Sequence, residues 1–324
     1  MIKKSFNSLI QSLKLENFKF SIFEFEEIGD YAPEDSDWNY KDITHTTYIH
    51  KDVEAIQASI MDDLQSSINL QKISLLGITI PLSVVNYEYD KFNQIYFTST
   101  GPFIVIGNTV SAAIKNKRTS VKTTFAVGSR GFFSFFNFFI KRLIVKNHKK
   151  LMSEDLPMRI RRGKLRENNH SFYNPKKSYS FSFSKDINRS NLFYKDNSEI
   201  FKILKEDILK AKDNSYIGEN IGIYSYLITK SNSETKVWPS TCPHEGAMLD
   251  KKCLKENSIQ CPWHGRKIQP LFSIDSNGET RSFPNIDYAV KEEGVYIKIK
   301  FRNNPEYYDK KPYNRISLIS LAIS

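Results

Sequence analysis

Two short clusters of cysteine and histidine constrain this chain more than any other feature of its sequence. Cys242 and His244 form the first cluster, and Cys261 and His264 form the second, after sixteen intervening residues. Thiolates and imidazoles are ligands for soft and borderline metals. Zinc fingers of the Cys2His2 type place the two cysteines together and the two histidines together, whereas each cluster here holds one of each. The pattern therefore predicts a metal site, and it argues against a zinc finger.

The two loops read C-P-H-E-G-A and C-P-W-H-G, and they resemble the ligand loops of Rieske [2Fe-2S] domains. In those domains two cysteines hold one iron and two histidines hold the other. The resemblance implies one [2Fe-2S] cluster per subunit, with Cys242 and Cys261 on the inner iron and His244 and His264 on the outer iron. It also implies electron transfer, with an electron donor such as a reductase or a ferredoxin.

The loops depart from those of the high-potential Rieske proteins of respiratory chains. Those proteins carry an extra cysteine in each loop and a serine after the second glycine, where this chain has Ala247, Trp263 and Arg266. Fewer hydrogen bonds to the cluster sulfur atoms favour the oxidised form. The resemblance therefore implies a midpoint potential near the low end of the Rieske range, about −150 mV.

Composition limits the class of protein. The chain has 324 residues, 40% of them hydrophobic, which is enough for two ordinary domains. Only three cysteines occur, so a disulfide framework is excluded, and we expect Cys253 to be a packed or free thiol. No signal peptide or membrane-spanning segment is recognisable, so we expect a cytoplasmic protein. The net charge of +11 fits several partners, but no nucleic-acid-binding motif accompanies it.

The N-terminal part shows a second, weaker resemblance. A strand over Ile43–Ile49, a short helix over Val53–Ile60, four further strands and a long helix over about 132–168 are predicted, with Pro157 expected to kink or interrupt that helix. This order, with the phrases Y-I-H-K-D-V-E-A-I and F-A-V-G, resembles the helix-grip fold of the START-like (SRPBCC) superfamily. The resemblance implies a curved antiparallel sheet on a long helix and a hydrophobic small-molecule or lipid ligand. The four strands are Ile78–Val85, Gln94–Ser99, Phe103–Ala113 and Thr119–Val127.

The predicted fold class is therefore α+β, with a helix-grip domain followed by a small all-β Rieske domain. The expected divisions are an N-terminal extension (1–35), a START-like domain (36–175), a linker with an amphipathic helix (176–213), a Rieske domain (214–305) and a C-terminal tail (306–324). At the start of the chain we expect a helix and a strand, followed by a turn or domain boundary at Pro33–Asp37. The linker helix is expected at Ser198–Lys212.

A second metal site is an alternative interpretation. Asp42-x-x-His45-x-x-x-x-His50 has the spacing of the mononuclear iron motif of Rieske oxygenases, and Asp155 or Glu154 are further candidate ligands. The predicted strand argues against this site, because residues five apart on a strand face opposite sides of a sheet. The domain order is also the reverse of that in the oxygenases. We therefore favour histidines without a ligand role.

Two other stretches have a structural and a functional interpretation. The phenylalanine run at residues 132–139 is expected to form the core face of the long helix, and an interfacial membrane contact is the alternative. The basic stretch Arg159–Lys164 is expected to be a solvated helix end, and an anionic or acidic-partner site is the alternative.

Three functions remain open from the sequence. The first is a Rieske electron-transfer protein or oxidoreductase component that acts in the oxidation of a hydrophobic small molecule. The second is a self-contained Rieske oxygenase with mononuclear iron at Asp42, His45 and His50. The third is a redox-sensing carrier of a hydrophobic ligand or lipid. The number of metal ions per chain separates the first two.

Overall fold

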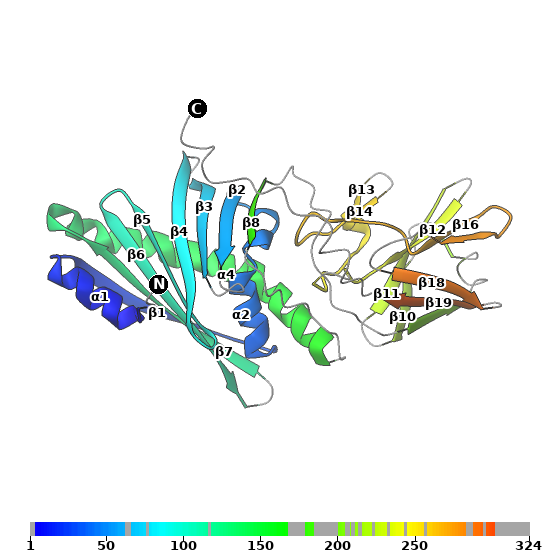
Figure 1. Cartoon of the computed structure of the whole chain (residues 1–324), viewed down its shortest axis with the longest axis horizontal. Coiled ribbons are helices and arrows are strands. Elements are labelled where there is room, and N and C mark those ends of the chain that lie inside the picture. The colour runs from blue at the N-terminus through cyan, green and yellow to red at the C-terminus, as the bar shows by residue number, and fades with distance from the viewer. Residues whose placement is uncertain are drawn as a thin grey trace. The chain divides into compact units, whose positions relative to one another are not determined.

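The structure is a computed structural model of the whole chain (Figure 1). It describes residues 4–61, 66–75, 78–115, 118–167, 179–184, 200–204, 208, 211–212, 216–221, 224–231, 234–242, 245–255, 258–282, 288–293 and 296–301. The predicted C-terminal tail lies outside the described residues. The chain divides into two compact units, the first mainly Met1–Gly163 and the second mainly Ile187–Tyr313.

An eight-stranded antiparallel sheet forms the body of the first unit, with the strand order β1-β7-β6-β5-β4-β3-β2-β8. All four strands predicted between residues 78 and 127 are present, and so are the N-terminal helix and the strand that follows it. The bounds are α1 Phe6–Leu15, β1 Lys19–Gly29, β2 Val53–Met61, β3 Ser66–Leu75, β4 Ile78–Asp90, β5 Asn93–Thr100, β6 Phe103–Ile114, β7 Arg118–Ser129 and β8 Tyr179–Ser184.

Helices cover both faces of this sheet. On one face, Ile10 of α1 packs with Ile95, Ile106 and Ala126 of the sheet. Successive residues of a strand face opposite sides, so the neighbour of Ala126, Phe125, belongs to the other face, where it contacts the long helix α4 (Asn137–Glu167). Strands on a long helix are the arrangement predicted for this unit, and the α+β class is confirmed.

Three predictions between residues 33 and 61 are wrong. Pro33–Asp37 begins a helix, α2 (Pro33–Lys41), in which proline takes the first position that its fixed φ favours. Ile43–Ile49 is helical, with a 3-10 turn η1 (Ile43–His45) followed by α3 (Thr46–Ile49). Val53–Ile60 is the strand β2, paired on both sides with other strands. In β2, pairing with β3 and β8 has overridden the local helical pattern.

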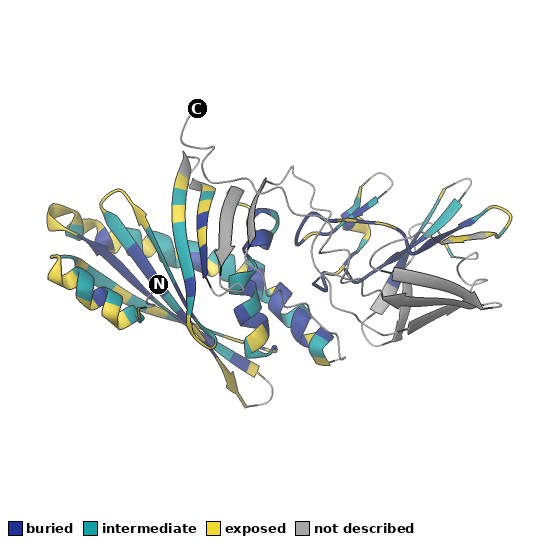
Figure 2. Ribbon diagram, in the orientation of Figure 1, coloured by how far each residue is buried: buried dark blue, intermediate teal, exposed yellow. Residues whose placement is uncertain are grey.

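The long helix is confirmed, but two details of its predicted surroundings are wrong. It runs without interruption through Pro157, after a 3-10 segment η3 (Gly131–Phe136). The phenylalanines at its start are exposed rather than in the core, and Figure 2 shows this end of α4 as largely exposed. Its basic end is only partly exposed to solvent, since Lys164 is exposed but Arg159 and Arg162 are buried. Their charges are matched by carboxylates, Glu27 for Arg159 at 3.2 Å and Asp35 for Arg162 at 3.5 Å.

The second unit consists of short antiparallel strands, as predicted for the all-β domain. The helix predicted over Ser198–Lys212 is wrong in its first part, because Ile200–Leu204 is the strand β9, which pairs with β19. The other strands are β10 Tyr216–Ile221, β11 Tyr224–Lys230, β12 Glu234–Pro239, β13 Leu254–Lys255, β14 Ser258–Gln260, β15 Lys267–Ile268, β16 Phe272–Asp275, β17 Thr280–Ser282, β18 Tyr288–Glu293 and β19 Tyr296–Phe301.

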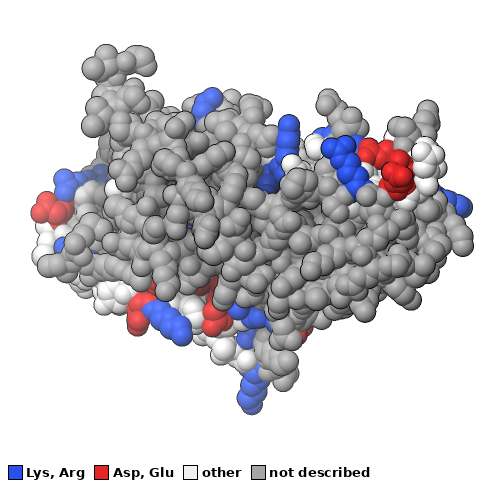
Figure 3. Space-filling view, turned by 45° about the vertical axis from the view of Figure 1, so that its right-hand side comes forward, with Lys and Arg blue, Asp and Glu red and all other residues white. Residues whose placement is uncertain are grey.

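Charge is mixed on the face of the molecule that Figure 3 shows. Among its described residues, basic and acidic side chains lie beside one another instead of in separate patches. The positive net charge is therefore not concentrated in the described part of this face. No helix among the described residues is both long enough and apolar enough to cross a membrane.

Candidate metal centres

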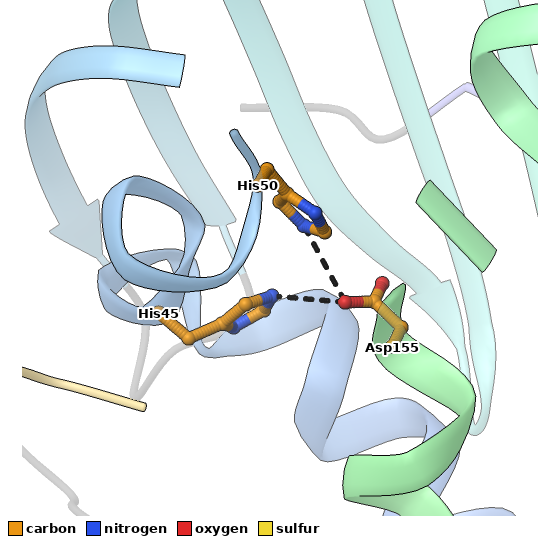
Figure 4. Close-up of side chains that lie close together, drawn as sticks. All are labelled: His45, His50 and Asp155. Atoms are coloured by element: carbon orange, nitrogen blue, oxygen red, sulfur yellow. Dashed lines mark ion pairs between the residues drawn. The ribbon is translucent and has the colours of Figure 1, made fainter. Parts of the chain in front are cut away.

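Three buried side chains of the first unit converge at one point (Figure 4). Oδ1 of Asp155 lies 3.4 Å from Nε2 of His45 and 3.4 Å from Nε2 of His50. One ligand atom from each residue lies within 4.8 Å of the other two. Two imidazoles and one carboxylate thus present their lone pairs to a common volume. We call these residues the His-His-Asp cluster.

Helical geometry between residues 43 and 50 makes this convergence possible. His45 ends η1 and His50 caps the C-terminus of α3, where its N–H donates to the carbonyl of Thr46 at 3.0 Å. The two rings lie with their centroids 5.3 Å apart. Asp155 reaches them from the middle of α4. The objection that the two histidines would face opposite sides of a strand therefore no longer applies.

A carboxylate faces the outer nitrogen of each imidazole, and the one beside His50 is within hydrogen-bond distance. Nδ1 of His50 lies 2.9 Å from Oε2 of Glu154, and Nδ1 of His45 lies 3.6 Å from Oδ2 of Asp42. Histidines that bind metal usually direct their second nitrogen at a carboxylate in this way, because it fixes the tautomer and the ring orientation. The sequence prediction of Asp42 as a direct ligand is thereby corrected. Asp42 faces the outer nitrogen of His45, and Asp155 is the carboxylate that converges with the inner nitrogens of both histidines.

The donor atoms of the cluster fit a bound cation. Nε2 of His45 and Oδ1 of Asp155 are buried and make no hydrogen bond, although buried polar atoms are normally paired. Two ligand atoms that each lie about 2.1 Å from a metal, with a right angle between the two bonds, are about 3 Å apart. This is close to the 3.4 Å between Oδ1 of Asp155 and Nε2 of each histidine. A small inward movement of the side chains would complete the site. The set of two histidines and one carboxylate leaves other coordination positions open.

Electrostatics in the cluster favour positive charge. Burial disfavours the charged form of His45, but the carboxylates of Asp155 and Asp42 outweigh this effect and raise the pKa of His45 to about 10. Burial also opposes ionisation of Asp155, yet His45 and His50 hold the pKa of that carboxyl below its usual value. For His50, burial dominates and lowers the pKa. Carboxylates that stabilise a proton at this point would also stabilise a metal cation.

The two loops of the second unit that carry Cys242 and Cys261 share one pattern of backbone hydrogen bonds. The N–H of Cys242 donates to the carbonyl of Ala247 at 2.8 Å, and the N–H of Gly246 donates back to the carbonyl of Cys242 at 2.9 Å. In the second loop the equivalent distances are 2.7 Å from Cys261 to Arg266 and 2.8 Å from Gly265 to Cys261. The repeated bonding pattern gives both cysteines the same local setting.

Glycine is required where these loops turn. Gly246 has φ of 85° and Gly265 has φ of 63°, in the left-handed region that side chains with a Cβ disfavour. This explains why a glycine follows each histidine in the sequence. Thr241 and Met248 form an isolated bridge at the base of the first loop, which anchors the turn to the rest of the unit.

The predicted cluster ligands that the structure describes are deeply buried. Cys242, Cys261 and His264 are all at most 1% exposed, while His244 lies outside the described residues. Burial raises the pKa of Cys261, but hydrogen bonds with Cys242 and His264 outweigh this and lower it to about 5. A thiol that ionises readily is suited to binding iron, because the ligand must be deprotonated.

Cys253 behaves as an ordinary packed thiol. It is buried, and its Sγ donates to the carbonyl of Met248 at 3.9 Å. Burial raises the pKa of this thiol to about 11. A thiol that resists ionisation is a poor metal ligand, so Cys253 has the packed-thiol environment expected of it.

Comparison with protein families gives the second unit its assignment. Residues 200–291 match the model of the Rieske [2Fe-2S] domain. The chain contains a Rieske domain. A Rieske domain indicates a [2Fe-2S] cluster and a role in electron transfer or another oxidoreductase function. No curated protein has a sequence that matches this chain.

Solved structures similar to the first unit have low sequence identity. The Zhui aromatase/cyclase from Streptomyces sp. R1128 is 11% identical, with 44% of this chain and 96% of that chain covered and a TM-score of 0.39. A START superfamily protein from Mycobacterium smegmatis is 9% identical, with 41% and 92% covered and a TM-score of 0.37.

Proposed function

We propose that this chain is a Rieske-type oxygenase with two separate iron centres. The first is the [2Fe-2S] cluster of the Rieske domain, and the second is a mononuclear Fe(II) ion in the His-His-Asp cluster. When bound, the mononuclear iron would supply dioxygen activation with electrons from the Rieske cluster. The proposed ligands of the [2Fe-2S] cluster are Cys242, His244, Cys261 and His264.

The convergence of His45, His50 and Asp155 is the observation that carries the proposal. A protein that only relays electrons needs its Rieske cluster and a partner, and it gains nothing from three buried metal donors elsewhere. Burying two imidazoles beside an ionised carboxylate is costly unless a cation or a network of hydrogen bonds stabilises them. Nε2 of His45 and Oδ1 of Asp155 make no hydrogen bond and lie 3.4 Å apart as an ion pair, which supports a metal ion as a further stabiliser.

The combination of centres favours iron over zinc. A set of two histidines and one carboxylate holds Fe(II) in non-haem oxygenases, although zinc also binds to such donors. Zinc has no redox chemistry, so electrons from a Rieske domain in the same chain would serve no purpose there. The reversed order of the two domains does not alter the ligand set, because all three donors belong to the first unit.

We further propose a substrate with an apolar or aromatic body. Phe25, Tyr96 and Phe125 bring their rings together between the sheet and α4, and His148 of α4 contacts Phe25 and Phe125 with centroids 4.9 Å and 5.0 Å away. His148 lies seven residues before Asp155, which corresponds to about 10 Å along a helix. Aromatic side chains packed against this part of α4 support the binding of a hydrophobic small molecule.

A metal titration tests the proposal without measuring activity. Mild chelation would remove the mononuclear iron while the visible absorbance of the Rieske cluster monitors the other centre. Co(II) would then be added, and its d–d absorption bands would report binding to nitrogen and oxygen donors. We expect one Co(II) site per chain in the native protein. The His50→Ala and Asp155→Ala variants should bind at least about tenfold more weakly, since each loses a direct ligand.

Asp52→Asn provides the matched control. Asp52 is a carboxylate of the same unit that pairs with Lys150 at 2.5 Å, outside the His-His-Asp cluster, so its variant should bind Co(II) normally. Absence of Co(II) binding to the native protein, or equal binding by the Asp155→Ala variant, would contradict the oxygenase proposal. The chain would then be a Rieske module that passes electrons to another protein.

A further inference from the structure

Six phenylalanines form an exposed aromatic surface at the start of the long helix. Their exposed fractions lie between 37% and 76%, although phenylalanine is among the residues most often buried. The rings contact one another, with centroid distances of 5.5 Å between Phe132 and Phe136 and 5.8 Å between Phe138 and Phe139. We call this surface the Phe cluster. Its members are Phe132, Phe133, Phe135, Phe136, Phe138 and Phe139.

Polar contacts hold the backbone so that these rings stay outside. Asn137, in the middle of the run, is the buried residue at this point. Its Oδ1 accepts a hydrogen bond from Ser129 at 2.7 Å, and its Nδ2 donates to the carbonyl of Lys19 at 2.9 Å. The inward position at this level of α4 is therefore occupied by an amide that is tied to β1 and β7. The neighbouring aromatic rings are exposed, although Phe133 also contacts Phe103 at the start of β6.

A basic stripe continues from the Phe cluster along the same side of the helix. Arg142, Lys146 and Lys149 are all exposed and follow Phe135 and Phe138 at spacings of three or four residues, which places them on one face. The guanidinium of Arg142 lies 4.3 Å from the ring centroid of Phe138, so the stripe and the cluster are in contact. We call these three residues the basic stripe.

Carboxylates are scarce around this surface. The sequence from Gly131 to Met152 contains no aspartate or glutamate. Among the described contacts at its edges, Glu16 pairs with Arg130 at 3.2 Å and Asp52 pairs with Lys150 at 2.5 Å. Neither carboxylate has a described ion pair with a residue of the basic stripe. The exposed face thus combines apolar rings with positive charge.

We propose that the Phe cluster and the basic stripe dock this protein on an anionic membrane surface. Aromatic side chains favour the boundary between lipid headgroups and acyl chains, where an apolar face lies in the membrane and a basic face contacts anionic lipids. The charge of the stripe complements the negative headgroups, and both parts lie on one helix. An apolar protein partner would contact the rings of the Phe cluster alone. The three cations of the basic stripe would then have no complementary charge.

Vesicle sedimentation of the full-length protein tests this proposal. One set of vesicles would contain phosphatidylcholine alone, and the other would contain phosphatidylcholine and phosphatidylserine at about 7:3, both at about 0.1 M salt, where exposed charges still interact over about 10 Å. We expect clear binding to the anionic vesicles and much weaker binding to the neutral ones. Raising the salt concentration should weaken the binding.

Two groups of variants separate the contributions. The triple variant Arg142→Gln, Lys146→Gln and Lys149→Gln should bind anionic vesicles roughly a hundredfold more weakly, since each cation near the surface contributes roughly fivefold. The double variant Phe135→Ser and Phe138→Ser should also bind more than about tenfold more weakly. All five positions are exposed, and none belongs to either proposed metal centre.

Matched controls come from exposed positions elsewhere. Ile68→Ser with Leu70→Ser removes apolar side chains from β3 that are 48% and 42% exposed, and Lys251→Gln with Lys252→Gln removes two exposed cations of the Rieske unit. Both controls should bind vesicles like the native protein. The proposal is overturned if the native protein does not sediment with anionic vesicles, or if it binds neutral vesicles equally well. It is also overturned by a dimer in solution that the Phe135→Ser and Phe138→Ser variant dissociates.

Discussion

At the scale of single residues, His148 is a buried histidine whose protonation opposes folding. Burial and, to a smaller extent, the positive charge of Arg159 lower its pKa from 6.5 to about 4. Because the pKa is lower in the folded chain, the unfolded chain binds the proton more tightly. The stability that depends on neutral His148 is therefore fully present above about pH 6.5, and it is lost as the pH falls toward 4.

This linkage predicts a measurable dependence on pH. Between pH 7.5 and pH 5, protonation of His148 should lower the free energy of unfolding by about 2 kcal/mol. The His148→Leu variant should lack this part of the change, and Lys149→Gln, at the neighbouring exposed position, should retain it. Urea unfolding of the three proteins at both pH values measures the difference. Identical pH dependence in native protein and His148→Leu would contradict the assignment.

A second prediction at the residue scale concerns the potential of the Rieske cluster. Arg266 occupies the position at which high-potential Rieske proteins have a serine, and its side chain is buried in this structure. Without a serine hydroxyl to donate to sulfur, the midpoint potential should lie near about −150 mV. Arg266→Ser should raise it. Spectroscopic redox titration measures both values, and a native midpoint above zero would rule out the low-potential assignment.

At the scale of elements, the loops that carry the cluster ligands depend on glycines with positive φ. Gly265→Ala should lower the free energy of unfolding by about 1–2 kcal/mol, because a side chain in the left-handed region is strained. It should also reduce the amount of bound cluster, since Gly265 closes the loop onto Cys261 at 2.8 Å.

Gly278 supplies the control for this loop. It has φ of 83° in an exposed turn, with no atom within 4 Å of the position of an added Cβ. Gly278→Ala should therefore lower stability by a similar amount and leave the visible absorbance per chain unchanged. If both variants lose cluster absorbance equally, then general destabilisation explains the loss and the loop has no specific role.

The elements also show what the sequence can and cannot predict. The Rieske loops were predictable because their ligands and glycines lie within a few residues of one another. The helical turn at residues 43–50 was not, since its β-branched residues favour a strand in isolation, whereas here the turn buries His45 and His50 against α4. The third donor of the His-His-Asp cluster, Asp155, is more than a hundred residues away from His45. Only the packing of α4 selects it over Glu154, which the sequence left as an equal candidate.

Local pattern was also misleading where a hydrophobic run met a polar anchor. The phenylalanines of η3 and α4 have the composition of a core segment, and they were expected to face the sheet. The structure gives that inward position to Asn137, because its amide can pair with Ser129 and with the backbone of Lys19. The available sequence signal was the polar residue Asn137 inside the aromatic run. An asparagine that takes the inward position leaves the phenylalanines on the outward side.

At the scale of the whole molecule, the proposed function assigns one metal centre to each of two compact units. The Rieske domain provides electron-transfer chemistry, and the first unit provides three converging metal donors between a sheet and a long helix. Each unit holds its residues by its own contacts, so each centre can be removed separately by mutation. The iron content of variants that lack one centre therefore reports how many centres the native chain holds.

The iron and sulfide content of the purified protein tests the central claim most directly. A [2Fe-2S] cluster together with a mononuclear ion predicts about three irons and two sulfides per native chain. Asp155→Ala should retain about two irons, both sulfides and the visible spectrum of the cluster. Two irons and two sulfides in both native protein and Asp155→Ala would contradict the account and leave a Rieske electron carrier.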